Sequence, residues 1–178
     1  MAPAKWVIDV GRSSVGFTVR HMLVSKVHGR FTAWRGEFTL DEATLPSSSA
    51  LVEVDVASVD TGDASRDEYL RTGEAFEPSK FPRMTFRSTS VSGSAKRFEI
   101  VGDLTLRGVT KAVALEVESK GRVAGTGGEG VRFSARGQLN RRDFGVNFNQ
   151  VLDAGGVAVS EKVELEIEVI GTRATPAP

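Results

Sequence analysis

Hydrophobic and polar residues alternate with a period of two in segment after segment of this chain. The clearest case is Glu161 to Ile170, in which Val, Leu and Ile alternate with Glu. Because successive side chains of a strand point to opposite faces, this period predicts β-strands with one dry and one wet face. The same alternation recurs between turn residues in eight further segments: 15–21, 28–34, 36–40, 50–59, 83–88, 97–106, 112–118 and 131–139.

So many strands exceed what a flat sheet with one wet face uses, and closing the sheet on itself removes its edges. We therefore predict an all-β fold, a single closed antiparallel β-barrel of about eight strands, with a sandwich of two sheets as the main alternative. A barrel of this size is either filled by side chains or holds one small ligand. One domain is expected over residues 1–178, with its core at about 6–170 and a frayed tail at 171–178.

One segment departs from the alternation. Asp63 to Arg71 is rich in helix formers and is followed by Gly73, which predicts a short helix. The loop from Phe76 to Pro82 then carries two aromatic residues and two prolines, which suits a cover over an open end of the barrel. A ligand must enter through one end, so we assign the helix and this loop to a lid in which Leu70, Phe76 and Phe81 pack on the opening.

The parity of the hydrophobic positions also shifts by one between Ala33 and Phe38. This shift predicts a bulge or a tight turn near Arg35 and Gly36. The Gly-rich stretch 120–130 is predicted to be a hairpin loop.

Composition excludes several classes of protein. The 23 Lys and Arg balance the 23 Asp and Glu, so no net field attracts nucleic acid. There is no Cys, which excludes disulfides, thiol nucleophiles and Cys-based metal sites. Two His cannot form a three-His zinc site, and neither an HExxH nor an EF-hand pattern occurs. We expect no metal and no cofactor.

The chain contains no apolar run of the roughly 20 residues that span a bilayer, so no stable membrane insertion is expected. Its first residues include no apolar segment of signal-peptide length. A cytoplasmic location is expected, or export if a leader has been removed.

Ten Phe against a single Tyr indicate an oily interior. These side chains either fill the barrel or form the wall of a cavity. Parity and spacing select the residues expected to line such a cavity and bind an apolar ligand: Phe17, Val19, His21, Phe31, Phe38, Met84, Phe86, Phe98, Ile100, Leu104, Leu106, Leu115 and Phe133.

The two histidines differ in their expected positions. His21 shares the parity of Phe17 and Val19, so it points to the dry face near a strand end. It is either a hydrogen-bonded core or rim histidine, or a donor to the head group of a ligand. His28 has the opposite parity and is expected to face solvent.

Two polar pairs near the predicted barrel ends also have alternative roles. Arg66 and Asp67 point about 100° apart on a helix, so they cannot simply pair with each other. Either both anchor the helix to the barrel, or Arg66 faces an anionic head group. Arg141 and Asp143 are either a buried ion pair at the end of the barrel, or Arg141 contacts the head group.

Several motifs, in order along the chain, resemble the YceI family. They are Trp6–Asp9, Ser13–His21, Val27–Phe31, Val59–Gly62, Arg66–Asp67 with Leu70, Phe76, Phe81–Pro82, Thr85–Phe86, Gly102–Thr110 and Asn140–Gly145. The resemblance runs from about Trp6 to Val169, although the family pattern usually has His where this chain has Arg12. It implies a lipocalin-like barrel that binds polyisoprenoid lipids, and it implies no catalytic residues.

Three hypotheses for function follow. The favoured one is the non-catalytic binding, storage or transport of a long isoprenoid, quinone-like or fatty-acyl lipid inside the barrel. At about 0.3 kcal/mol per heavy atom, a tail of about 40 carbons supports roughly nanomolar binding without polar contacts. The second is a small enzyme that uses His21 and a carboxylate as an acid–base pair. The third is a filled barrel that acts through its surface, as a homodimer or a stress-related interaction protein.

Overall fold

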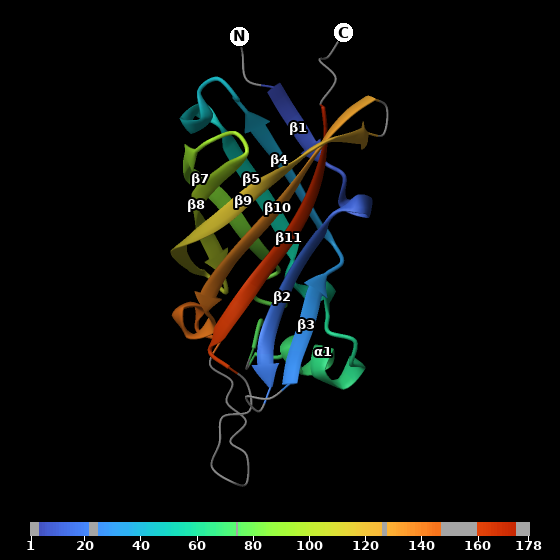
Figure 1. The fold of residues 1–178 in the computed structure, drawn as a ribbon. Helices are drawn as coiled ribbons and strands as arrows, with labels where there is room; N and C mark the ends of the chain where they lie inside the picture. The colour runs from blue at the N-terminus through green and yellow to red at the C-terminus, as the bar shows by residue number, and fades with distance from the viewer. Residues whose placement is uncertain (1–3, 22–24, 74, 126–127, 147–159, 174–178) are drawn as a thin grey trace.

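Antiparallel pairing closes the strands of this chain into a barrel (Figure 1). The computed structural model describes residues 4–21, 25–73, 75–125, 128–146 and 160–173. Its strands are β1 (Ala4–Ile8), β2 (Ser14–His21), β3 (Ser25–Phe31), β4 (Trp34–Leu40), β5 (Ser49–Asp55), β6 (Val59–Asp60), β7 (Arg83–Gly93), β8 (Arg97–Leu106), β9 (Val109–Gly125), β10 (Gly128–Asn140) and β11 (Lys162–Arg173). The α-helix among these residues, α1, spans Ala64–Leu70.

The strand order shows how the barrel closes. Strands β1, β4, β5, β7, β8, β9, β10 and β11 follow one another as hydrogen-bonded neighbours, and β1 pairs again with β11. Beside this ring, β2 pairs with β11 and β3, and β3 pairs with β6. The predicted closed barrel of about eight strands is therefore confirmed, and the alternative of a two-sheet sandwich is wrong.

The parity shift lies three residues earlier than the sequence pattern predicts. Strand β4 pairs with β5 from Trp34 to Thr39 without a change of register, so there is no bulge at Arg35 and Gly36. Instead, the regular strand structure is interrupted at Thr32 and Ala33, which separate β3 from β4. There the amide of Thr32 donates to the carbonyl oxygen of Ser58, and the carbonyl oxygen of Ala33 accepts from Asp55. The break changes the alternation because these two residues belong to neither strand.

Elsewhere in the strands, the alternation predicts correctly which side chains are buried and which are exposed. Phe98, Leu104, Leu115 and Phe133 are buried inside the barrel, whereas Glu99 and Glu116 are exposed. Thr18 is the exception, since it has the parity of the outer face and is still buried. Its hydroxyl lies 2.7 Å from Nδ1 of His28, whose side chain is exposed as predicted.

The two ends of the barrel differ. Strand β1 and the last residues of β11 lie at one end, called the termini end below, and α1 lies toward the other (Figure 1). Aromatic rings fill the interior near the termini end. The rings of Trp6 and Phe38 stack with centroids 6.2 Å apart, and the ring of Phe133 contacts those of Phe38 and Phe98 at 5.7 and 5.9 Å. This aromatic cluster therefore lies in the part of the interior nearest the termini end.

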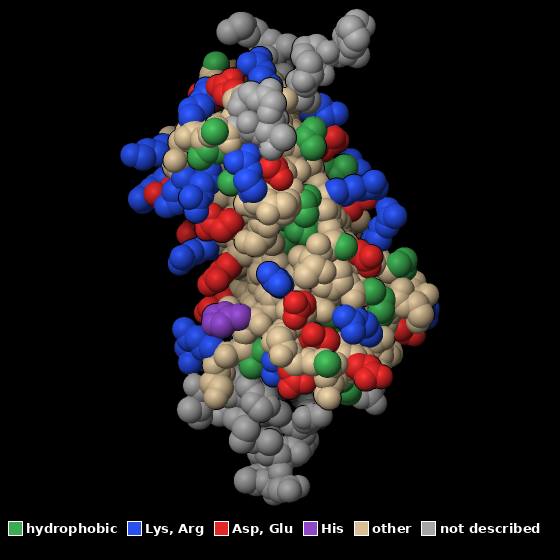
Figure 2. Space-filling view, turned by 90° about the vertical axis from the view of Figure 1, so that its right-hand side faces the viewer, with side chains coloured by type: hydrophobic (Ala, Val, Ile, Leu, Met, Phe, Trp, Pro, Cys, Tyr) green, Lys and Arg blue, Asp and Glu red, His purple; other side chains and the backbone are tan. Residues whose placement is uncertain are grey.

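The outer surface is charged. On the face shown in Figure 2, basic and acidic side chains are mixed, and hydrophobic side chains occur in scattered groups. Large hydrophobic residues are thus concentrated inside, and Val7 is an exposed exception at 46%. Within the described residues, no helix is long and apolar enough to cross a bilayer.

Candidate functional site

The barrel encloses an apolar chamber in its middle. This inner chamber has a volume of about 180 Å³. Its wall comes from strands all around the ring, because each strand contributes its inward-facing positions. Eight of the residues predicted to bind ligand line it: Phe38, Met84, Phe86, Phe98, Ile100, Leu104, Leu115 and Phe133.

A second, larger chamber lies at the α1 end. This outer chamber has a volume of about 510 Å³ and is lined by β2, β3, α1 and the ends of several barrel strands. Met84, Leu139 and Leu165 line both chambers and so lie between them. Predicted residues in the outer chamber are Phe17, Val19, Phe31, Leu106, Arg66, Leu70, Phe76 and Arg141. The barrel is therefore not completely filled by its Phe side chains.

Several aromatic rings of the walls lie directly against glycine, and those of Phe17 and Phe86 show the closest approaches. The ring of Phe17 covers Gly29, its partner across β2 and β3, so closely that a Cβ at Gly29 would lie 2.2 Å from Cζ. In the same way, a Cβ at Gly102 would lie 2.4 Å from Cζ of Phe86. Phe17 lines the outer chamber and Phe86 the inner one. These glycines allow the rings to lie flat against the neighbouring strand.

Helix α1 covers the outer chamber. Asp63 caps it, because its carboxylate accepts hydrogen bonds from the amides of Ser65 and Arg66 at 3.0 and 3.1 Å. The Leu70 side chain is buried against the barrel, and Phe76 follows the helix with its ring 6.0 Å from that of Phe31. The predicted helix thus lies where a lid was expected.

Arg66 and Asp67 both hold Thr61, the residue that leads from β6 toward the helix. The carboxylate of Asp67 is buried and accepts from the amide and the hydroxyl of Thr61 at 2.9 and 2.5 Å. Arg66 donates through Nε to the hydroxyl and through Nη2 to the carbonyl oxygen of Thr61, both at 2.8 Å. The two residues therefore act as anchors of the helix, and Arg66 also lines the outer chamber.

Arg107 joins the lid to the barrel, and the sequence pattern does not predict this role. It lies in the two-residue turn between β8 and β9, where both Arg107 and Gly108 have a positive φ. Its guanidinium donates to the carbonyl oxygens of Gly73 and Gly145, and it lies 3.7 Å from the carboxylate of Glu77. The Arg-Gly pair signals a tight turn, but no local pattern indicates partners so far along the chain.

Phe81 has a different position from the one expected. Its ring packs on the outer side of the same turn, where a Cβ at Gly108 would lie 2.9 Å from Cε1. Lys80 lies over this ring, 5.4 Å from its centroid. The lining of the outer chamber includes Leu70 and Phe76, whereas Phe81 is not among the described residues that line either chamber. Phe81 thus fastens the lid segment from outside.

Arg141 is buried at the edge of the outer chamber. It donates through Nη1 to the carbonyl oxygen of Val146 at 2.7 Å and through Nε to that of Ser160 at 3.0 Å. Burial lowers the pKa of the Arg141 guanidinium, and the neighbouring positive charge of Arg142 lowers it further, while Glu161 raises it. Asp143 is exposed, so the expected buried pair with Arg141 is wrong. Backbone carbonyl oxygens thus accept two of the hydrogen bonds that this cation donates.

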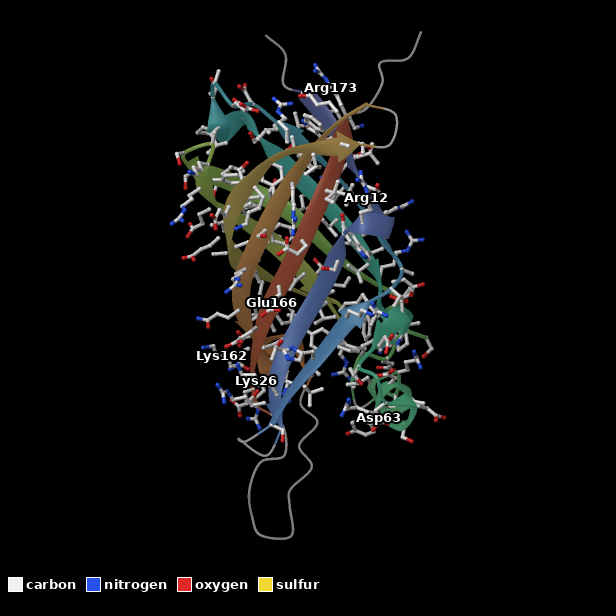
Figure 3. All side chains as sticks on the ribbon, turned by 45° about the vertical axis from the view of Figure 1, so that its right-hand side comes forward. Arg12, Lys26, Asp63, Lys162, Glu166 and Arg173 are labelled. Carbon is white, nitrogen blue, oxygen red and sulfur yellow. The ribbon has the colours of Figure 1, made fainter. Side chains whose placement is uncertain are left out.

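His21 lies in the last position of β2, opposite Ser25, but its side chain is outside the described part of the structure. Its predicted role therefore stays a prediction. In the described residues, no group of three or more His, Asp or Glu side chains is placed to hold a metal ion. Arg12 lies at the opposite end from Asp63 and α1 (Figure 3). It donates to Asp9 and to the carbonyl oxygen of Ala124, both at 2.8 Å.

Comparison with known sequences agrees with this architecture. A family model described as YceI-like domain matches residues 6–170. Protein YceI of Salmonella newport (strain SL254) is 38% identical over 160 residues, which cover 89% of this chain and 81% of the relative. A UPF0312 protein of Vibrio cholerae serotype O1 is 36% identical over 176 residues, covering 96% of this chain and 88% of that protein.

Solved structures share the barrel. The crystal structure of the Campylobacter jejuni YCEI protein is 28% identical, with a TM-score of 0.74 over 88% of this chain and 90% of that one. Burkholderia cenocepacia BcnA, at 22% identity, has a TM-score of 0.82 over 93% of this chain and 99% of its own. A polyisoprenoid binding domain from Saccharophagus degradans, at 16% identity, has a TM-score of 0.64 over 97% and 99%. The last two show a common fold. Because the family model spans most of the chain and the curated relatives match at more than a third identity, this chain belongs to the YceI-like domain family.

Proposed function

We propose that the barrel binds the tail of a single-chain apolar lipid, isoprenoid or fatty-acyl, without catalysing its conversion. The observation that carries this proposal is the pair of neighbouring apolar chambers, which share Met84, Leu139 and Leu165 in their walls. The Saccharophagus degradans protein, which has the same fold, is described as a polyisoprenoid binding domain, and this likeness supports an apolar ligand here.

The volume of the outer chamber sets the scale of the affinity. An apolar cavity of about 150 Å³ holds benzene, which corresponds to roughly 25 Å³ per carbon atom. The outer chamber of about 510 Å³ then accepts roughly 20 carbons. At about 0.3 kcal/mol per heavy atom, such a tail contributes about 6 kcal/mol, so it supplies much of a micromolar affinity.

Arg66 is the side chain proposed to contact the head group. It lines the outer chamber, is half-buried and donates through Nε and Nη2 to Thr61. None of the described residues accepts a hydrogen bond from its Nη1, and none places a carboxylate within ion-pair distance of it. A carboxylate, phosphate or carbonyl oxygen at the edge of the chamber would complete the hydrogen bonds of this guanidinium.

The lid is the proposed route of entry. Helix α1 and Phe76 cover the larger chamber, whereas the rings of Trp6, Phe38, Phe98 and Phe133 pack on one another toward the termini end. A tail that enters under α1 reaches the outer chamber first. Opening at this end would allow the protein to take up and release its lipid, as storage or transport requires.

Denaturing extraction of the purified protein after incubation with lipid vesicles, followed by mass spectrometry of the organic phase, tests the proposal. We expect one chemically unaltered single-chain lipid per protein. Val19→Asp places a carboxylate in the outer chamber and should abolish uptake, while Val7→Asp, the same change at an exposed position, should leave uptake intact. Absence of lipid from the wild-type protein, or equal uptake by both variants, would contradict the proposal.

A further inference from the structure

The two faces of the β2–β3 hairpin differ near the end of the barrel at which α1 lies. On the inner face, Val19 and Val27 are cross-strand partners, and both line the outer chamber. On the outer face, the next pair is Arg20 and Lys26, which lie directly opposite each other and are exposed. The same two strands therefore supply part of the chamber wall and two positive charges on the surface of the protein.

Lys162, the first residue of β11, is a third exposed cation near this pair. The amide of Ser160 donates to the carbonyl oxygen of Arg20 at 2.9 Å, so this end of β11 lies beside the hairpin. Figure 3 shows Lys26 and Lys162 toward the same end of the barrel as Asp63. Arg20, Lys26 and Lys162 together are called the basic cluster below.

The charges of the basic cluster are not neutralised within the described parts of the chain, where no carboxylate lies within ion-pair distance of any of the three. Asp60 pairs with Arg30 at 3.5 Å, and Glu161 pairs with Arg142 at 3.0 Å. Glu164 lies further along the same face of β11. Like charges directly opposite each other in a sheet are destabilising. An anion outside the protein would remove this repulsion.

We infer that the basic cluster docks the α1 end of the barrel on an anionic lipid surface. Because the chain has no net charge, attraction to such a surface depends on a local group of cations. The sequence between Arg20 and Lys26 contains no acidic residue and includes Met22, Leu23 and Val24. Binding at a membrane interface combines apolar burial with attraction to anionic lipids, so this composition favours a lipid surface over a soluble polyanion.

Docking at this place has a consequence for lipid uptake, and this consequence alone rests on the proposed function. Val19 and Val27 border the outer chamber on the other side of the same hairpin. A barrel docked through the basic cluster therefore holds the wall of its larger chamber next to the membrane from which a lipid tail is taken. The tail then crosses less water than it would on its way to a barrel free in solution.

The test measures partition of the full-length protein onto vesicles by cosedimentation. Vesicles of equimolar phosphatidylcholine and phosphatidylglycerol should bind the wild type, vesicles of phosphatidylcholine alone should not, and added salt should weaken the binding. Each basic residue close to an anionic surface contributes about fivefold to the partition coefficient. The triple variant Arg20→Gln, Lys26→Gln, Lys162→Gln should therefore lose roughly 100-fold.

A second triple variant with the same change of net charge is the matched control. Arg87, Lys96 and Arg136 are exposed on β7, in the β7–β8 turn and on β10, and none of them has an ion pair within the described residues. Glutamine at these three positions should lower the partition coefficient only a few-fold. Since all six positions are exposed, both variants should keep the Tm of the wild type within about 2 °C.

Three results would overturn the inference. They are equal binding to the two kinds of vesicle, equal losses in the two triple variants, and tighter binding of the wild type to poly-glutamate than to the anionic vesicles. The last result would identify an acidic polypeptide as the partner. None of these measurements detects lipid inside the barrel, so failure of docking leaves the proposed function intact. A protein that docks but takes up no lipid contradicts only the proposed function.

Discussion

Arg107 donates a hydrogen bond from the β8–β9 turn to the carbonyl oxygen of Gly73 at 2.8 Å, and so ties the lid segment to the barrel. A hydrogen bond from a charged group contributes about 1.5 kcal/mol or more when partly buried. We therefore expect Arg107→Met to make opening of the lid about tenfold more frequent. Amide hydrogen exchange over residues 64–82 should accelerate, and so should release of bound lipid.

Arg97 provides the control for this prediction, since it is an exposed arginine at the opposite end of β8 whose guanidinium lies 3.7 Å from the carboxylate of Glu118. Arg97→Met should leave both rates unchanged. Equal exchange over residues 64–82 in the Arg107 variant and the wild type would show that the lid is held by other contacts.

The contribution of Arg66 to ligand affinity can be measured separately from the contribution of the lipid tail. Fatty acids and alcohols of equal chain length differ in the negative charge of the head group. Losing a charge-assisted hydrogen bond costs about 1.5 to 3 kcal/mol. Arg66→Met should thus weaken binding of the acid by at least about tenfold and leave binding of the alcohol nearly unchanged, as measured by calorimetric titration.

Arg71 supplies the comparison for Arg66, because it bonds to the carbonyl oxygens of Ala57 and Val59 and does not line the outer chamber among the described residues. Arg71→Met should not discriminate between acid and alcohol. A parallel loss of both ligands in the Arg66 variant would assign Arg66 to anchoring alone.

Asp67 should contribute to stability through the docking of α1. Its buried carboxylate accepts two hydrogen bonds from Thr61, and Asp67→Ala leaves these donors without an acceptor. The expected loss is about 2 kcal/mol in the free energy of unfolding, or a decrease of about 4 to 8 °C in Tm. Glu68→Ala, at an exposed position of the same helix, should change Tm by less than about 2 °C. Similar Tm values for the two variants would contradict this role.

The stability of the folded protein should depend on pH through Glu53, which lies on the outer face of the barrel. The hydrogen bond from Arg35, together with the charges of Arg35 and Arg83, lowers the pKa of Glu53 below its ordinary value, although desolvation opposes this shift. A lowered pKa in the folded state means that this stabilisation is present above the ordinary pKa of about 4.3 and is lost as the pH falls through the folded-state value.

The Tm of the wild type should therefore exceed that of Glu53→Gln near neutral pH, and the two should converge in acid. Because this pair is exposed, the difference should also decrease with added salt. If a difference in Tm persists at a pH at which Glu53 is protonated, the packing of the side chain rather than its charge is responsible.

Local alternation carries enough information to predict the barrel wall. Phe98 and Leu104 face inward because every second residue of a paired strand does so, and this holds wherever pairing is regular. The pattern fails at Thr32 and Ala33, where the chain leaves one strand and begins the next. There the hydrogen bonds run to Ser58 and Asp55, which only the folded chain brings close.

The polar part of the candidate site is harder to predict for the same reason. Helix geometry shows that Arg66 and Asp67 cannot pair with each other, but it does not reveal that both hold Thr61. The sequence suggests Asp143 or a ligand head group as the partner of Arg141, and it does not reveal the hydrogen bonds to the carbonyl oxygens of Val146 and Ser160. Backbone acceptors are present at every residue, so sequence patterns do not identify which of them a buried cation will use.

The contact between Phe17 and Gly29 has a consequence for how the ligand preference of this family changes during evolution. The width of the outer chamber at this point depends on a residue that has no side chain and contributes no surface to the ligand. Any larger residue at position 29 displaces the Phe17 ring, because its Cβ would lie 2.2 Å from Cζ. Selection for a smaller or larger ligand can therefore act on glycines behind the aromatic wall, and a comparison of lining residues alone would overlook it.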